Sequence, residues 1–404
     1  MIKIAVLGYG TIGSGVVEVL QTNHEVIARK AGSEIGVKYV LDLREFPGNP
    51  VQEILVHDFE VILQDPEVRV VVETMGGVNP AYDFSKRALL AGKHVCTSNK
   101  ELVAEHGVEL MQIAAEKNVN YMFEASCGGG IPIIRALNDS LTADVVDAVT
   151  GILNGTTNYI LSKMTMNGSE FSDALAEAQE KGYAERNPEA DVEGYDACRK
   201  IAILSSLAYG SHVDYRDVYT EGISGITAAD IRCAAAMGMA VKLLARSRKE
   251  GDFVFAGVTP VLVGQDNPLY AVNDVFNAVL VHGNMLGDAM FYGSGAGSLP
   301  TASAVAADVV DCVKNLNRNA AAPGSGRTLK VLPFEETESR FFVRIAGSPE
   351  EKLAGITVLF GEVETVAADG VEGEFGFLTG RIREKEFAEK LSGMEGVRNR
   401  IRVM

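Results

Sequence analysis

The sequence predicts an α/β protein that begins with a doubly wound parallel sheet and continues into two units of different build. Over the first 130 residues, short apolar segments rich in β-branched residues alternate with helical stretches, which is typical of parallel strands with right-handed crossovers. The first segment runs into the glycine motif Gly8-x-Gly10-x-x-Gly13 and then into a helix. This context favours a Rossmann-type dinucleotide-binding sheet.

We expect residues 1–130 to form this dinucleotide-binding domain. A helix of small residues within 301–318 is expected to return to it, after a second glycine-rich loop that contains Gly297. The predicted strands are Ile2–Leu7, Val37–Leu41, Arg69–Val72, His94–Thr97 and Val119–Phe123, with helices at Ser14–Leu20 and Pro80–Ala91.

Residues 131–300 are expected to form an α+β domain for substrate binding and dimerisation, because strands and helices no longer alternate simply. Residues 319–334 lack apolar periodicity, which predicts a linker, and residues 335–404 show a βαββαβ order. The predicted elements are strands Ala143–Ile152, Val254–Val263 and Val275–Val281, helices Tyr159–Met166, Phe171–Gln179 and Gly194–Ala208, and, in the last unit, strands Arg340–Ile345, Glu362–Ala367, Glu374–Thr379 and Val397–Met404 with helix Glu384–Leu391.

Composition excludes several classes of partner. The formal net charge of −17 over 404 residues argues against nucleic acid or an anionic membrane surface. Five scattered cysteines without a CxxC pair fit reduced thiols and not a disulfide framework or a zinc site. No apolar segment reaches membrane-spanning length. We therefore expect a cytoplasmic protein that acts on a small molecule.

The glycine loop has the residues that a dinucleotide pyrophosphate requires. Gly8 permits the tight turn, Gly10 lets the backbone approach the phosphates, and Gly13 packs the helix on the strand, with Thr11 and Ile12 between them. The helix N-terminus then faces the diphosphate charge.

The residues expected at the ribose end of the coenzyme site are compatible with both NAD and NADP. Near the end of the second strand, Asp42 could bond the 2′-hydroxyl of NAD, whereas Arg44 could pair with the 2′-phosphate of NADP. Neither coenzyme is favoured by these two residues.

Polar residues follow the third and fourth strands, at the carboxyl edge where open α/β sheets bind ligands. Thr74 and Gly76 follow the third strand, and Ser98 and Lys100 follow the fourth. A helix N-terminus is an unfavourable place for a purely structural cation. Lys100 is therefore expected near the coenzyme or the substrate.

A second polar cluster lies outside the nucleotide unit. The run beginning Asn154-Gly155-Thr156 offers amide and hydroxyl groups, and one lysine with several carboxylates follows about thirty residues later. Such a set can hold a small zwitterion and move a proton on it. Its titratable members are Glu185, Asp191, Asp196 and Lys200.

Asp196 and Lys200 share one face of a predicted helix, because they are four residues apart. A surface ion pair and a buried proton donor are both compatible with this spacing. The strongly apolar continuation of the helix makes burial plausible, and from the residues alone the two readings stay even.

The segment after the fifth strand, from Glu124 to Pro132, combines a carboxylate with a bend of three glycines. Carbonyl and carboxylate oxygens suit a hard cation. From the residues alone, a plain strand-to-helix connection is the favoured interpretation, with Pro132 in the first helical turn and Cys127 as a small buried residue.

These motifs together resemble homoserine dehydrogenase over most of the chain. The Asn-Gly-Thr-Thr-Asn run and the Asp-x-x-Gly-x-Asp-x-x-x-Lys run are specific to that family among nicotinamide enzymes. The segments that carry the resemblance are Gly8–Gly13, Gly92–Lys100, Phe123–Pro132, Gly151–Asn158, Gly182–Glu185, Asp191–Lys200 and Tyr292–Ser303.

The resemblance implies NAD(P)-dependent interconversion of L-homoserine and L-aspartate 4-semialdehyde, on the route to threonine, methionine and isoleucine. It implies that Lys200 is the general acid/base, that Asp196 orients it and that Lys100 lies between coenzyme and reacting atoms. It further implies that Glu185 takes the substrate ammonium and that Gly297 packs near the nicotinamide. A sodium ion is implied as well, with Glu124, Cys127, Gly129 and Ile131 as its ligands.

The last unit resembles an ACT domain, which senses threonine in many relatives. Its usual glycine-containing ligand loop is absent, and Ser348-Pro-Glu-Glu-Lys352 reads as an ordinary helix start with Ser348 as cap. We therefore expect little threonine effect and a role in association. A homodimer or homotetramer is inferred from the family and from the apolar strand Val275–Val281.

Two rival functions are weighed. A semialdehyde dehydrogenase needs a cysteine nucleophile with a histidine base, and Cys127 and His282 are the candidates, although neither lies in a suitable motif. A non-catalytic nucleotide sensor would use the last unit as its output. The combination of Glu185, Asp196 and Lys200 argues against a sensor.

Overall fold

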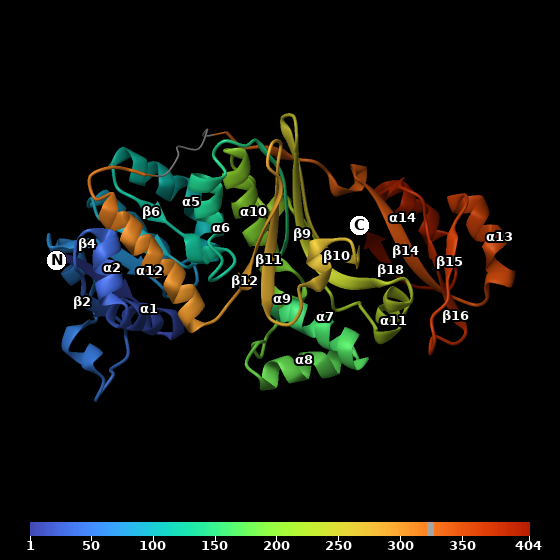
Figure 1. The fold of residues 1–404 in the computed structure, drawn as a ribbon, viewed down its shortest axis with the longest axis horizontal. Coiled ribbons are helices and arrows are strands. Elements are labelled where there is room, and N and C mark those ends of the chain that lie inside the picture. Colours follow the sequence, from blue (N-terminus) through green and yellow to red (C-terminus); the bar gives the residue numbers. More distant parts are fainter. Residues whose placement is uncertain (321–326) are drawn as a thin grey trace.

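A computed structural model describes residues 1–320 and 327–404 (Figure 1). The molecule is elongated, with the N-terminal sheet at one end, the C-terminal residues at the other and a mixed sheet between them. Among the described residues, no helix is long and apolar enough to cross a membrane.

The N-terminal sheet has six parallel strands in the order β3-β2-β1-β4-β5-β6, which confirms the predicted Rossmann-like sheet. Two helices were not predicted: α2 (His24–Ala31), which fills the long gap between the glycine loop and the second strand, and α3 (Phe59–Gln64). The other elements are β1 Ile2–Leu7, α1 Thr11–Thr22, β2 Ile35–Leu41, β3 Leu55–Val56, β4 Val68–Glu73, α4 Ala81–Leu90, β5 His94–Thr97, α5 Lys100–Glu116 and β6 Tyr121–Met122.

Helix α12 (Ser298–Lys314) comes from late in the chain and packs against α1. The contact is close because Gly15 has no side chain: a Cβ there would lie 2.8 Å from the Ser298 hydroxyl and 3.1 Å from the Ala302 Cβ. Val305 and Val309 of α12 are fully buried in the core that contains strands β1 and β4. The polypeptide thus crosses from the first sheet to the middle region and back.

The middle region contains two long strands that were not predicted, besides the two-residue strand β8 (Tyr219–Thr220). β9 (Met239–Glu250) pairs antiparallel with β10 (Phe253–Gly264), and β12 (Gly287–Ser294) forms an edge next to β11 (Phe276–Gly283). The first half of β9 is almost continuously buried, so it lacks the alternation that marks a half-exposed strand. The remaining elements here include β7 Val146–Ile152, α7 Gly155–Asn167, α8 Phe171–Glu180, α9 Glu189–Val192, α10 Tyr195–Tyr209, β8 Tyr219–Thr220 and α11 Ala228–Ala236.

The C-terminal residues follow the predicted βαββαβ order, and their strands lie in the order β18-β14-β16-β15. They do not form a sheet of their own, because β18 pairs in parallel with β10 through Val261–Arg402 and Leu262–Val403. One mixed sheet therefore runs through the middle and C-terminal regions. The elements are β14 Glu338–Ala346, α13 Pro349–Phe360, β15 Glu364–Val366, β16 Glu374–Leu378, α14 Glu384–Ser392 and β18 Val397–Val403.

Two local predictions concern the connection and the first C-terminal helix. The predicted linker 319–334 includes residues 321–326, which lie outside the described residues, and it also contains a short strand, β13 (Lys330–Val331), that pairs with β10. Helix α13 begins as expected after Ser348, whose backbone N–H donates to the Glu351 carboxylate at 3.4 Å in a capping box.

Candidate active site

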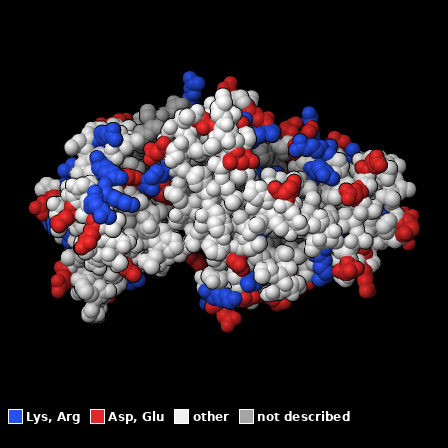
Figure 2. All heavy atoms as spheres, in the orientation of Figure 1, with Lys and Arg blue, Asp and Glu red and all other residues white. Residues whose placement is uncertain are grey.

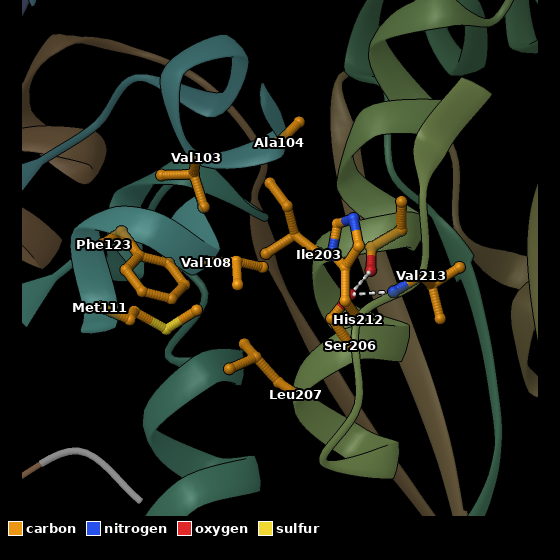
Figure 3. Close-up of a pocket in the computed structure, with 11 residues that line it drawn as sticks. Val103, Ala104, Val108, Met111, Phe123, Ile203, Ser206, Leu207, His212 and Val213 are labelled. Carbon is orange, nitrogen blue, oxygen red and sulfur yellow. Dashed lines mark hydrogen bonds between the residues drawn. The ribbon is translucent and has the colours of Figure 1, made fainter. Parts of the chain in front are cut away.

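Helices α5 and α10 meet between the two sheets, and this contact brings their N-terminal ends together. Behind those ends they enclose a small apolar cavity of about 30 Å³ (Figure 3). Val103 and Val108 of α5 face Ile203 and Leu207 of α10 across it. The polar chemistry lies at the helix starts, where α5 begins with Lys100 and the first turn of α10 carries Asp196.

Asp196 connects the two lysines. Its Oδ1 lies 2.6 Å from Lys100 Nζ, and its Oδ2 accepts a hydrogen bond from Lys200 Nζ at 2.7 Å. Lys200 also donates to the Leu153 carbonyl at 2.7 Å. Asp196 is only 2% exposed and Lys200 is 8% exposed. The interpretation as a surface ion pair is thus wrong for Asp196 and Lys200, which are buried and contact Lys100 at the start of α5 through Asp196.

Asn154 joins this cluster to a second carboxylate. Its Nδ2 donates to Asp196 Oδ2 at 2.8 Å and to Asp191 Oδ1 at 2.7 Å. Its Oδ1 accepts the Thr157 N–H at 2.8 Å and so caps α7. The amide therefore fixes α7, α9 and α10 relative to one another at the site.

The cluster separates the protonation behaviour of its two aspartates. Burial raises the pKa of Asp196, but the charges of Lys200 and Lys100 outweigh burial and hold the pKa well below its usual range. Burial and the charge of Asp196 raise the pKa of Asp191. Burial lowers the pKa of Lys100, yet Asp196 shifts that pKa to a net increase. Lys100 and Asp196 therefore remain charged at neutral pH.

Three predicted substrate-binding residues lie outside this cluster. Glu185 is on an exposed loop, and its backbone carbonyl accepts the Gln179 side chain at 3.0 Å. Thr156 donates to the Tyr183 carbonyl at 2.7 Å, which ties the start of α7 to that loop. Gly155 is needed for packing, because a Cβ there would lie 2.7 Å from the Val275 carbonyl oxygen.

The glycine loop at the start of α1 has the close backbone packing of a dinucleotide site. Gly8 adopts φ +90°, and a Cβ on Gly13 would lie 1.9 Å from the Gly8 carbonyl oxygen. Gly10 has open space where its Cβ would be, as a loop that admits phosphates requires. Helix α1 begins at Thr11, with Ile12 packed against the core. These residues fit a dinucleotide.

Asp42 and Arg44 are partners of each other. Asp42 accepts the Tyr9 N–H at 2.8 Å and pairs with the Arg44 guanidinium at 2.9 Å. The Arg44 side chain is 61% exposed at the end of β2, and its guanidinium carbon lies 5.3 Å from the centre of the Phe46 ring. At the expected ribose position the Arg44 guanidinium is therefore exposed, whereas the Asp42 side chain is only 9% exposed and is bonded to Tyr9 and Arg44.

A buried glutamate that sequence reasoning overlooked organises the carboxyl edge of the sheet. Glu73, the last residue of β4, accepts the Met75 N–H at 2.7 Å and the Thr97 hydroxyl at 2.5 Å. Thr74 donates to the Leu7 and Gly8 carbonyls at 3.0 Å. The position of Glu73 at the end of a predicted strand could have indicated this role from the sequence. Around it, Gly76 has φ +79° and Ser98 donates weakly to the Glu73 carbonyl.

The second glycine-rich loop links the middle sheet to α12. Gly297 adopts φ +118° and precedes the first residue of α12. Gly129 packs directly on this loop, because a Cβ there would lie 2.5 Å from the Gly295 carbonyl oxygen. The loop that should hold a cation and the loop expected near the nicotinamide are thus in contact.

The Glu124 carboxylate, which is expected to bind a cation, accepts hydrogen bonds from the backbone. Its two oxygens accept the N–H groups of Ile134 at 2.8 Å and Arg135 at 2.7 Å, and the Arg135 guanidinium lies 3.6 Å away. The Ile131 carbonyl accepts the Ile133 N–H. Within the described residues, no group of three or more acidic, histidine or cysteine side chains could hold a metal. Cys127 is buried, and burial raises its pKa to about 12.

Comparisons with known proteins identify the family of the chain. The family model described as homoserine dehydrogenase matches residues 132–310, and the one described as homoserine dehydrogenase, NAD binding domain, matches residues 8–124. The chain is 42% identical to a homoserine dehydrogenase from Synechocystis, over 85% of this chain and 82% of that protein. It is 37% identical to one from Neisseria gonorrhoeae, over 98% and 95%.

Solved structures show the same similarity. A homoserine dehydrogenase from Thiobacillus denitrificans superposes with a TM-score of 0.92 at 37% identity, covering 100% of this chain and 98% of that one. A hyperthermophilic archaeal homoserine dehydrogenase in complex with NADPH gives a TM-score of 0.67 at 27% identity, covering 77% and 97%. The chain belongs to the homoserine dehydrogenase family, NAD(P)-dependent oxidoreductases that interconvert L-homoserine and L-aspartate 4-semialdehyde.

Proposed function

We propose that Lys200 carries the proton in this reaction and that Asp196 and Lys100 hold it in place. The observation that carries the proposal is the chain of contacts Lys100–Asp196–Lys200 at 2.6 and 2.7 Å, in which Asp196 and Lys200 are buried and Lys100 is partly exposed. The test follows the absorbance of the reduced coenzyme after L-homoserine is added together with NAD or NADP. Homoserine-dependent reduction is expected from the full chain, and its absence from folded protein would refute the proposal.

Each residue of the cluster has a separate proposed role in the reaction. Bound NAD(P) supplies the hydride acceptor or donor, and the protein supplies orientation and the proton. In the reducing direction, the Lys200 ammonium gives a proton to the aldehyde oxygen as the carbon accepts hydride. In the oxidising direction, neutral Lys200 takes the hydroxyl proton. Asp196 keeps Lys200 aimed, and Lys100 adds positive charge near the reacting oxygen.

The remaining carboxylates suit the substrate's ammonium. Asp191 is half-buried beside Asn154, and the charges of Lys200 and Lys100 both act on its carboxylate. Glu185, on the exposed loop tied to α7 through Tyr183, would reach the ammonium from the open side of the site. The substrate is thereby held at one end while its oxygen faces Lys200.

We expect Glu185→Gln to weaken homoserine binding more than coenzyme binding. The substitution removes one charge-assisted hydrogen bond to the ammonium, at a cost of roughly 1.5–3 kcal/mol. The KM for L-homoserine and the Kd of coenzyme are to be measured in parallel, with Glu180→Gln, an exposed neighbour, as control. A change confined to coenzyme affinity would show that Glu185 is misplaced.

Arg44 is proposed to read the 2′-phosphate of NADP, with Asp42 as the partner that orients its guanidinium. Arg44→Ala should then reduce NADP use about tenfold or more, with little effect on NAD use. The values of kcat/KM for both coenzymes test this, and Arg381→Ala, an exposed arginine of the C-terminal region, is the matched control. Equal losses for both coenzymes would contradict a role at the ribose.

A sodium ion stays a proposal that rests on family resemblance. The Glu124 side chain is engaged with α6 (Ile133–Arg135), so any cation would have to rely on the backbone carbonyls of Cys127 and Gly129. No step of the reaction is routed through it.

We also propose a homodimer or homotetramer and an ACT-like C-terminal unit that serves association. The edge strand β12 exposes Met290 and Tyr292, and the turn before it exposes Met285 and Leu286. Figure 2 shows a largely uncharged surface over the region of β11 and β12. Exposed apolar groups along a sheet edge favour pairing with another subunit.

A chain ending at Arg327 should be less stable than the full chain and should tend to aggregate. The truncation removes β18 and leaves part of β10 without its parallel neighbour, so backbone groups and apolar side chains become exposed. Thermal unfolding and sedimentation of both chains give the comparison. Unchanged stability and assembly would show that the C-terminal residues are an independent appendage.

A further inference from the structure

We propose that Glu221 is a positioning residue for substrate binding, through which two arginines of the last strand fix the active-site helix α9. The inference deepens the proposed function, because it rests on Asp191 of α9 as a substrate-binding carboxylate. Glu221 itself touches neither Lys200 nor Asp196 in any recorded contact. Its effect would pass through the backbone of residues 221–223.

Helix α9 is a single turn that needs support from its neighbours. It spans Glu189–Val192, and the preceding loop is largely exposed. On one side the Asp191 carboxylate is held by Asn154 at 2.7 Å. On the other side the Val192 carbonyl accepts the Ile223 N–H at 2.8 Å. The position of Asp191 therefore depends on where residues 221–223 lie.

In this second contact the backbone of residues 222–223 packs directly on the backbone of residues 192–193. A Cβ on Gly222 would lie 2.3 Å from the Val192 carbonyl oxygen and 2.5 Å from the Glu193 Cα. Opposite it, a Cβ on Gly194 would lie 3.1 Å from Thr220 Cγ2. Because the Val192 carbonyl and the Glu193 Cα lie this close to Gly222, a shift of residues 221–223 would displace α9.

Glu221 anchors its segment to the C-terminal strand β18. Its carboxylate pairs with Arg402 Nη1 at 2.8 Å and Arg400 Nη1 at 3.0 Å, while its own N–H donates to the Val258 carbonyl at 2.8 Å. Burial raises the pKa of Glu221, but Arg402 and Arg400 outweigh it and lower the pKa overall. The anchor is therefore ionised at neutral pH.

Arg402, the partner of Glu221, is itself held firmly in place. Its side chain is 2% exposed, and its Nε and Nη2 bind both oxygens of Glu384 at 2.7 and 2.9 Å. Its guanidinium carbon lies 4.8 Å from the Phe334 ring centre. Arg402 already has a bidentate partner and β18 is already paired with β10 and β14. The segment around Glu221 is tied to β10 by the pairing of β8 and by the Val258 carbonyl, and the ion pair ties it to β18 as well.

Glu221→Gln in the full chain tests the proposal. We expect the KM for L-homoserine to rise roughly 3- to 30-fold, with kcat and the KM for coenzyme little changed. Glu374→Gln is the matched control, because Glu374 is similarly half-buried and also pairs with two arginines, Arg344 and Arg398, away from α9. It should lower thermal stability without raising the KM for homoserine. An equal rise in both variants would overturn the proposal.

A double variant shows whether Glu221 acts by positioning Asp191 or by a general effect on protein stability. If Glu221 acts through Asp191, Glu221→Gln added to Asp191→Asn should raise the KM no further than Asp191→Asn alone. Additive effects would contradict the proposal. If Asp191→Asn leaves the KM unchanged, the proposed role of Asp191 is wrong. If Asp191→Asn raises the KM but Glu221→Gln leaves the KM unchanged, the proposal for Glu221 is wrong and that for Asp191 stands. Should Glu221→Gln fail to fold, Arg400→Ala, which removes a partly exposed arginine, carries the same test.

Discussion

Lys200→Ala is expected to lower kcat about 10²–10⁴-fold, the usual contribution of a positioned general acid or base. Coenzyme affinity should remain close to that of the unaltered chain, because Lys200 lies on α10, outside the sheet that carries the glycine loop. Without the ammonium, the Leu153 carbonyl loses this donor and Asp196 Oδ2 keeps only the Asn154 amide as donor, while Lys100 still compensates the aspartate charge.

Lys242→Ala is the matched control for this loss. Lys242 is also a buried lysine, and it donates to the Val272 carbonyl at 2.5 Å and to Asn273 at 2.9 Å. Its removal should cost stability and leave kcat nearly unchanged. Rates of coenzyme reduction at saturating homoserine, with coenzyme Kd on the same samples, provide the comparison. Near-normal turnover by folded Lys200→Ala would remove the lysine from the mechanism.

Asp196→Asn is expected to damage both activity and stability. It leaves two lysines without their shared carboxylate, and breaking a buried ion pair in this way costs about 3–5 kcal/mol. Lys200 would lose the group that aims it, so kcat should fall on the order of 10²-fold or more. Asp308→Asn, which alters an equally buried carboxylate outside the cluster, should leave kcat within a small factor.

The stability effect of Asp196 should depend on pH in one direction. Its pKa is lower in the folded chain than in the unfolded chain, where it is about 3.9. The carboxylate thus contributes stability above that value, and the contribution is lost as pH falls towards the folded pKa. The difference in unfolding free energy between the unaltered chain and Asp196→Asn should shrink below about pH 4. A difference that grows on acidification would contradict the ion-pair account.

Sequence reasoning worked where local geometry dictates the outcome. Gly8 and Gly13 were predicted from their spacing after a strand, and both are required by the turn and by the contact between their backbones. The four-residue spacing of Asp196 and Lys200 placed them on one helix face, although only the packed helices showed that the pair is buried and shared with Lys100.

The remaining features depend on contacts between distant segments. Strand β9 was missed because both its faces are covered, which removes the alternation of a half-exposed strand. The pairing of Arg402 with Glu221 joins residues far apart in sequence, and no spacing rule anticipates it. Asn154 was expected to bind substrate, but its role in bridging Asp191 and Asp196 depends on three helices meeting.

Rescue of Lys200→Ala by small amines tests the central claim most directly. The substitution removes most of a buried side chain in front of Asp196, and an added primary amine can bind there and transfer the proton in place of Lys200. Ethylammonium is expected to raise kcat in a saturable manner in Lys200→Ala and to have no such effect in Asp196→Asn, where the Lys200 side chain still fills this space. No increase with any small amine, while homoserine and coenzyme still bind to Lys200→Ala, would contradict proton transfer by Lys200.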